Sequence, residues 1–209
     1  MGISACKKGP NDPTFSIYSR KARVVGEWKL TAGSETQTNS GSTVITSDDG
    51  ENQTVNAGST PYIDAHTLSF TFERKGNYKS MEHRVHTDVT TAGTTTLTVT
   101  TTTDDTHTGN WNFTGKIGEY KNKSQLALNE LTYATAQSVR SLLKSGSTVL
   151  SDTTTNSSNS VSYTGNPGGA EIWDLDELRS KKMVAKIKYT KVDASGGSSS
   201  RDATWTFEQ

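Results

Sequence analysis

The sequence predicts an all-β protein, an antiparallel up-and-down β-barrel of about eight strands. Apolar and polar side chains alternate in short segments near both ends of the chain, as they do in strands with one buried face. Turn-forming residues separate these segments, and there is no repeated alternation of strand and helix patterns, which would favour a parallel sheet. A barrel that closes by pairing its first and last strands has no exposed edge, and this fits the strong patterns at both ends.

The clearest strand pattern lies in residues 23–31, where the chain places two sets of side chains on opposite sides of an extended backbone. One side carries the mostly apolar set, Val24, Gly26, Trp28 and Leu30. The other side carries the polar set, Arg23, Glu27, Lys29 and Thr31. A similar pattern ends the chain, where Ala203, Trp205 and Phe207 oppose Thr204, Thr206 and Glu208. We therefore expect these two segments to be the first and last strands of the barrel.

Further strands are predicted in the middle of the chain. Residues 68–73 and 78–89 form a hairpin, with Leu68, Phe70 and Phe72 pointing inward. Other segments with alternating side chains are 94–103, 111–117, 125–129 and 183–190. The buried aromatic side chains of these strands would supply much of the core, at roughly 1.5–3 kcal/mol each.

Three segments do not alternate in this way. Residues 32–59 and 147–159 are rich in Gly, Ser, Thr, Asn and Asp, which favours long polar loops, with a short hairpin at 42–47 in the first of them. Residues 131–143 place leucine, valine and alanine at approximately helical spacing. The segment therefore fits either a helix or a strand, and of the two we expect one short helix packed on the barrel.

Composition narrows the function classes. The chain has 22 basic and 22 acidic residues, so it lacks the basic face that nucleic-acid binding requires. Hydrophobic residues make up only 30% of the chain, so the core is lean. We expect no nucleic-acid partner.

The single cysteine, Cys6, is informative because of its position. It follows Ile3, Ser4 and Ala5 and precedes a polar segment with prolines, which resembles a bacterial lipobox, where the cysteine is lipidated after signal-peptide cleavage. One lipidated residue would anchor a domain to a membrane without inserting it. We expect residues 1–20 to be a lipobox remnant and flexible tether, and residues 21–209 to be the barrel domain.

The segment Gly26-Glu27-Trp28 resembles the Gly-x-Trp that begins the first barrel strand in lipocalins, and residues 15–28 resemble the tether-to-barrel junction of lipocalin-like lipoproteins of Bacteroidota. The resemblance covers this junction well and the remainder of the chain more loosely. It implies a lipid-anchored, lipocalin-like barrel at the outer membrane, on either side of it. It also implies that Trp28 closes the barrel floor and that Arg201, or an arginine near the first strand, stacks on it.

The sequence matches no catalytic template. It contains no Gly-x-Ser-x-Gly elbow, phosphate-binding glycine loop, paired-cysteine zinc motif or His-Glu-x-x-His. His83 and His86 would fall on opposite faces of a strand, and Asp174, Asp176 and Glu177 fit a charged turn. We expect no enzyme activity, no metal and no cofactor.

Four aromatic residues near the expected barrel mouth are candidate ligand contacts, because aromatic rings stack on sugars and on apolar ligands. They are Tyr120, Tyr133, Tyr163 and Trp173. Packing at the rim is the alternative role for them. The segment Asp152-Thr153-Thr154 resembles the O-glycosylation sequon of Bacteroidota, which makes Thr153 a candidate modification site.

Two function classes therefore remain open. In the first, favoured by the lean core and the long polar loops, the protein is a non-catalytic interaction module of the cell envelope and an accessory subunit of an outer-membrane protein complex. In the second, it is a lipocalin-type carrier that holds a small apolar or sugar-like ligand in the barrel. The second class requires a lumen that the inward Phe and Trp side chains do not fill.

Overall fold

The computed structural model describes residues 10–12, 18–58, 60–115, 124–163, 169–192 and 197–209. Within them the chain forms one short helix and a single antiparallel sheet of 11 strands. The elements are α1 (Arg20–Val24), β1 (Gly26–Asn39), β2 (Ser42–Asp48), β3 (Asn52–Asn56), β4 (Tyr62–Phe72), β5 (Asn77–Ala92), β6 (Thr95–Phe113), β7 (Gln125–Ser145), β8 (Thr148–Ser162), β9 (Gly169–Leu178), β10 (Lys182–Val192) and β11 (Ser198–Glu208). The all-β, antiparallel class expected from the sequence is thereby confirmed.

The sheet closes into a ring of 10 strands, because β1 pairs with β11 and β6 pairs with β7. The first strand therefore pairs with the last, as the alternation at both ends of the chain predicts. Over Gly26–Lys29, β1 also pairs directly with β4, whereas β2 and β3 lie between these two strands further along. The ring is thus narrow at the end next to α1 and wider at the opposite end.

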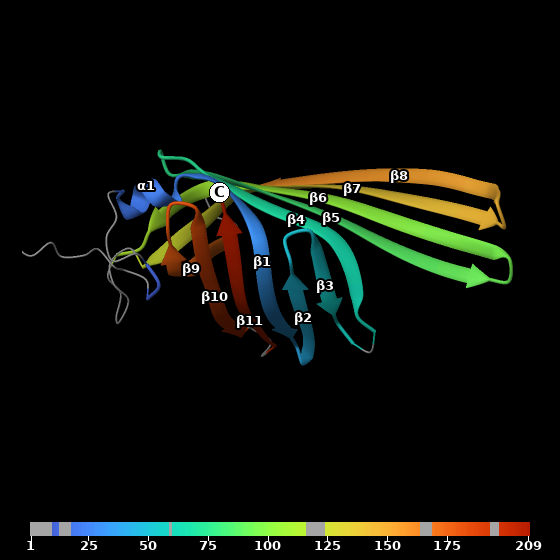
Figure 1. Cartoon of the computed structure of the whole chain (residues 1–209), viewed down its shortest axis with the longest axis horizontal. Helices are drawn as coiled ribbons and strands as arrows, with labels where there is room; N and C mark the ends of the chain where they lie inside the picture. The colour runs from blue at the N-terminus through green and yellow to red at the C-terminus, as the bar shows by residue number, and fades with distance from the viewer. Residues whose placement is uncertain (1–9, 13–17, 59, 116–123, 164–168, 193–196) are drawn as a thin grey trace, which may run out of the picture.

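Four strands extend beyond the ring at its wide end and form a long projecting sheet, which we call the arm (Figure 1). The arm comprises residues 87–92 of β5, 95–103 of β6, 137–145 of β7 and all of β8. Its two hairpin tips are joined by a hydrogen bond from the Gly146 amide to the Thr94 carbonyl, at 2.9 Å. Every residue of β8 is exposed, and within the described chain β8 pairs only with β7.

The expected helix and polar loops are wrong in the structure. Residues 131–143 belong to β7, where Val139 lies opposite Thr101 and Leu143 opposite Leu97 of β6, so pairing between strands outweighs the approximate helical spacing. Residues 32–59 contain the second half of β1, then β2 and β3, and residues 147–159 lie in β8. These strands carry polar side chains on both faces, so they lack the apolar alternation that would reveal them.

A cluster of aromatic side chains fills the narrow half of the ring. We call Trp28, Phe70, Phe72, Trp173 and Phe207 the aromatic floor, since each is at most 7% exposed. The Trp173 and Phe207 rings stack with centroids 5.7 Å apart, and Phe70 meets Trp173 edge-on at 4.9 Å.

Trp28 lies in this floor and donates from Nε1 to the Val24 carbonyl at 2.8 Å. The expectation that Arg201 stacks on Trp28 is wrong, because the Arg201 guanidinium lies over Trp205, 4.9 Å from the ring centroid. Arg201 lies in β11 four residues before Trp205. It is therefore closer to the wide end of the ring than the aromatic floor is.

Polar contacts cover the narrow end of the ring. Arg20 of α1 forms a buried ion pair with Asp12, and the Leu178 amide donates to Asp12 Oδ1 at 2.8 Å. Arg23 donates to the Leu178 carbonyl. Asp12 and the helix α1 are thereby attached to β9. Among the described residues, no helix is long and apolar enough to cross a bilayer.

Candidate functional site

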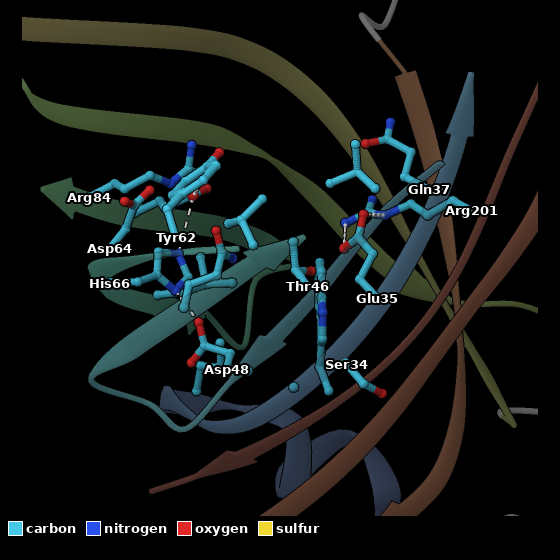
Figure 2. A pocket seen from close by; sticks show the side chains of 18 residues that line it. Ser34, Glu35, Gln37, Thr46, Asp48, Tyr62, Asp64, His66, Arg84 and Arg201 are labelled. Atoms are coloured by element: carbon cyan, nitrogen blue, oxygen red, sulfur yellow. Dashed lines mark hydrogen bonds and ion pairs between the residues drawn. The ribbon is translucent and has the colours of Figure 1, made fainter. Parts of the chain in front are cut away.

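The space inside the ring above the aromatic floor is open. A cavity of about 540 Å³, which we call the central cavity, adjoins a second one of about 310 Å³, the His66 pocket shown in Figure 2. The two share Leu68, Glu82, Arg201 and Trp205 as lining residues. Volumes of this size are typical of small-molecule sites in proteins.

Strand alternation explains why charged side chains face this space. On β4, His66 has the same parity as Phe70 and Phe72, so it points to the same side of the sheet. On β11, Arg201 has the same parity as Trp205 and Phe207 in the same way. Each strand thus contributes apolar side chains to the floor and polar ones above it.

His66 is the centre of the first polar network. Its side chain is 3% exposed, and its Nδ1 contacts Asp48 Oδ2 while its Nε2 lies 3.1 Å from Glu82 Oε1. Arg84 is paired with the same Glu82 carboxylate. Figure 2 shows His66 beside Asp48, with the contact between them drawn as a dashed line.

The two carboxylates determine the protonation state of His66. Burial by itself lowers the pKa of His66, but the hydrogen bonds and charges of Asp48 and Glu82 outweigh burial and raise it to about 9. Burial likewise raises the pKa of Glu82, and His66 and Arg84 reverse this and lower it. His66 is therefore a cation at neutral pH.

A tight turn between β2 and β3 positions Asp48. Gly50 adopts a φ of +91°, and a Cβ there would lie 2.8 Å from the Leu30 carbonyl oxygen. The Gly50 amide donates to Asp48 Oδ1 at 2.7 Å, which leaves Oδ2 of the same carboxylate for His66.

Arg201 is the centre of the second network. It donates to both carboxylate oxygens of Glu35, at 2.9 and 3.0 Å, and to Oε1 of Glu171. Burial lowers the pKa of Arg201, but Glu35 and Glu171 overcome this and raise it. Trp173 donates from Nε1 to the remaining Glu171 oxygen at 2.8 Å, so the aromatic floor holds this carboxylate from below.

The hydroxyl groups of two buried residues line the central cavity without a hydrogen bond to any described residue. They belong to Tyr78, which is 7% exposed, and Ser80, which is 4% exposed. Burial raises the pKa of Tyr78, and the charges of Glu130 and Glu171 raise it further, so both carboxylates are near this phenol. Among the described residues, Glu130 is bonded only to His107, whose Nδ1 lies 2.7 Å from Glu130 Oε1.

Gly109 makes room for the Tyr78 ring. The two residues face each other in the β5–β6 pairing, and a Cβ on Gly109 would lie 2.6 Å from Tyr78 Cε1 and 2.0 Å from the Asn129 carbonyl oxygen. The pairing of β6 with β7 shifts register at this point, between Thr108 and Gly109. A residue without a side chain is therefore required beside Tyr78.

The structure does not bring the four aromatic candidates together. Trp173 lies in the floor, and Tyr133 lies at the base of the arm, where its hydroxyl donates to Asp105 at 3.0 Å. Tyr163 is half-buried at the end of β8, and its amide donates to the Leu131 carbonyl at 2.9 Å. None of these three is a lining residue of the two cavities. Tyr120 lies outside the described residues.

Two of these aromatic residues contact residues that line the central cavity. Trp173 bonds to Glu171 through its indole Nε1, and the Tyr133 ring lies 4.8 Å from the His107 ring, centroid to centroid.

The charged residues that line the two cavities were not predicted from the sequence. The parity of His66 with the core residues of β4, and of Arg201 with those of β11, was a readable signal. Glu130 and Glu171 carried no such signal, because their meeting depends on the β7–β9 register.

Within the described residues, no three His, Cys, Asp or Glu side chains are grouped to hold a metal ion. His83 and His86 occupy opposite faces of β5, where each contacts a separate carboxylate, Asp104 and Asp64. In comparison with known proteins, the chain matches no family model, no curated protein and no solved structure.

Proposed function

We propose that this protein is a non-catalytic binding module that holds a small ligand in the lumen of its β-barrel. The observation that carries the proposal is the central cavity of about 540 Å³, lined by the hydroxyls of the buried residues Tyr78 and Ser80, which bond to no described residue. Because these hydroxyls line the cavity, they are available to hydrogen-bond a ligand held there. The aromatic side chains fill only the floor of the ring and leave the space above it open.

The pairing of the charged groups supports binding without catalysis. A general base needs a free lone pair near neutral pH, but both ring nitrogens of His66 contact carboxylates and the raised pKa keeps this ring protonated. Glu82 and Glu171 each bond to a cation in the same way. Groups paired like this fix the shape and polarity of a site and are poorly placed to transfer protons.

A cavity-filling variant tests this proposal. Ser80→Phe places a ring in the central cavity, whereas Thr71→Phe, on the exposed face of the neighbouring strand β4, is the matched control. We expect the wild type and the control to enhance the fluorescence of an apolar dye and Ser80→Phe to lose most of that enhancement. Equal enhancement by all three proteins would place the dye outside the lumen and contradict the proposal.

A second candidate function is an interaction module, which the arm supports. Strand β8 presents a fully exposed backbone edge, and edges of this kind accept an added strand from a partner. Its only ionisable residue, Asp152, is bonded to Arg140 on β7, with contacts at 2.9 and 2.7 Å. In this role the protein is an accessory subunit of an outer-membrane protein complex.

The two roles can be separated with a shortened arm. A protein in which the arm is removed should keep its dye binding if the lumen is the functional site. If the arm is the docking element, co-purification of a partner from native envelopes should be lost in the same protein. A partner that remains bound to the shortened protein would exclude the removed part of the arm as the docking element.

We further propose that Cys6 is lipidated and that the protein is attached to the outer membrane. Cys6 lies outside the described residues, so this proposal depends on the lipobox-like sequence before it. Metabolic labelling with a fatty acid should mark the wild type and not Cys6→Ala, while the control Ser4→Ala stays labelled. Labelling that survives Cys6→Ala would contradict the assignment.

Thr153 remains the proposed O-glycosylation site. The structure places it on β8 opposite Ser141, with an exposed side chain. The intact mass of protein from its native host should exceed the sequence mass, and the difference should disappear in Thr153→Ala but not in Thr155→Ala. An intact mass equal to that of the polypeptide plus the lipid would rule out this modification.

A further inference from the structure

The geometry points to a small organic cation, a protonated amine with an apolar body, as the class of ligand that occupies the central cavity. This inference rests on the proposed function, because it specifies the ligand of the same site. It is carried by the charge of the lining, by two unpartnered hydroxyls and by the apolar floor.

The lining of the lumen carries more carboxylates than cations. The two cavities are lined by six carboxylates, against two arginines, one lysine and two histidines, so acids are in excess even with both histidines protonated. The lysine, Lys188, is 78% exposed on its side chain and pairs with Asp202 on the outer surface, which increases the imbalance inside. A cavity with walls of one dominant sign attracts ligands of the opposite charge.

The central cavity itself is lined by three carboxylates, Glu82, Glu130 and Glu171, and by one guanidinium, that of Arg201. Arg201 is shared by Glu35 and Glu171, so one guanidinium balances two carboxylates. Within the part of the chain that the structure describes, the one partner of Glu130 is the His107 imidazole. The charges of Glu130 and Glu171 both raise the pKa of the Tyr78 phenol. Both carboxylates, which also line the cavity, are therefore near the Tyr78 side chain.

The unpartnered hydroxyls of Tyr78 and Ser80 make this more than an acidic cluster. Both side chains are more than nine-tenths buried and line the cavity, and neither bonds to a described residue. An ammonium group has three N–H donors and no acceptor. Placed beside Tyr78, it can donate to the two hydroxyl oxygens and to the Glu130 carboxylate, and so satisfy groups that the protein leaves open.

The rest of the lining suits an apolar body attached to the amine. Leu68, Phe70 and Leu128 line the same cavity, and the Tyr78 ring offers a further aromatic surface. The face of Trp205 is less available, because the Arg201 guanidinium already lies over it. An aromatic or aliphatic group therefore rests on the floor while the ammonium faces the carboxylates.

Calorimetric titration of the full chain with three probes of the same size tests the inference. The probes are phenylethylamine, phenylethanol and phenylacetate, which share a ring and differ in charge. We expect phenylethylamine to bind at least about tenfold more tightly than phenylethanol, and phenylacetate not to bind. Equal binding of the amine and the alcohol, or tighter binding of the acid, would overturn the inference.

Variants locate the binding in the cavity. Glu130→Gln and Tyr78→Phe should each weaken phenylethylamine about tenfold and leave phenylethanol nearly unchanged. Asp202→Asn, which removes an outer carboxylate, is the control for net charge and should not change binding of the amine. A loss in Asp202→Asn equal to that in Glu130→Gln would show nonspecific attraction and overturn the inference.

The apolar dye separates failure of this inference from failure of the proposed function. If the dye binds in a manner that Ser80→Phe abolishes but phenylethylamine does not bind, the lumen is a ligand site and the amine class is wrong. If neither the dye nor any probe binds, both the amine class and the lumen site are wrong.

Discussion

At the scale of single residues, the lumen depends on charged groups that hold one another in place. His66 lies between Asp48 and Glu82, and Arg201 between Glu35 and Glu171, so each cation is bonded to carboxylates from different strands. Removing one partner of such a buried pair leaves an uncompensated charge, which costs more than the pair contributes when intact. These residues therefore maintain the open shape above the aromatic floor.

His66 should make the stability of the protein depend on pH. Its pKa is about 9 in the folded protein and near 6.5 in the unfolded chain, so the folded state binds the proton more tightly. Its contribution, on the order of 3 kcal/mol, is fully present below about pH 6.5 and is lost as the pH rises through about 9. Urea unfolding at a series of pH values should show this decline.

The variant His66→Gln should reduce the decline, because glutamine does not titrate, whereas His86, whose pKa the hydrogen bond to Asp64 also raises, still contributes. His83→Gln is the matched control, since His83 is exposed and contacts only Asp104. If the decline between pH 6.5 and 9 is unchanged in His66→Gln, the raised pKa is wrong.

Gly109 gives a second prediction at this scale. Gly109→Ala adds a Cβ that would lie 2.0 Å from the Asn129 carbonyl oxygen and 2.6 Å from the Tyr78 ring, so strands β6 and β7 must shift. We expect a loss of about 1–3 kcal/mol in the free energy of unfolding, measured by chemical denaturation. Gly115→Ala is the control, because no atom of the described residues beyond its chain neighbours lies within 4 Å of its added Cβ. Equal stability of the two variants would contradict the packing around Tyr78.

At the scale of elements, the arm and the ring differ in what stabilises them. The ring strands bury the aromatic floor, whereas β8 is exposed along its whole length and the arm residues are exposed or half-buried. Threonine pairs across the strands, such as Thr87 with Thr100, contribute to the arm on its exposed surface. The arm should therefore contribute little to the stability of the ring.

Shortening the arm tests this division. Thr87 lies opposite Thr100, Thr100 opposite Arg140, and Arg140 opposite Thr154, so all four strands can be cut at one level. Joining Thr87 to Thr100, and Arg140 to Thr154, through Asn-Gly turns keeps the ring strands intact. We expect the melting temperature, measured by circular dichroism, to change by less than about 5 °C. Loss of cooperative unfolding would show that the arm belongs to the same folding unit.

How far the sequence could predict each element depends on whether the element has an apolar face. Trp28, Phe70 and Phe207 alternate with polar neighbours, so the ring strands that carry them and the closure of β1 on β11 could be predicted. Strands β2, β3 and β8 have polar side chains on both faces and resemble loops. The segment 131–143 has leucines and a valine at spacings compatible with a helix, and only its pairing with β6 makes it a strand.

At the scale of the whole molecule, the ring and the arm place two different surfaces on one chain. The lumen offers a net acidic cavity above an apolar floor, and the arm offers an exposed strand edge beyond the wide end of the same ring (Figure 1). The cavity residues come from strands far apart in sequence, such as Tyr78, Glu130 and Arg201, which meet only because the ring closes. This dependence on closure explains why the site could not be assembled from the sequence.

Native mass spectrometry of the protein, extracted gently from its own membranes, tests most directly whether the lumen holds a small ligand. We expect a reproducible low-mass adduct on the wild type and on Thr71→Phe, and no adduct on Ser80→Phe, in which the central cavity is filled. An adduct that persists in Ser80→Phe, or a wild-type protein that carries no adduct under any gentle extraction, would contradict this expectation.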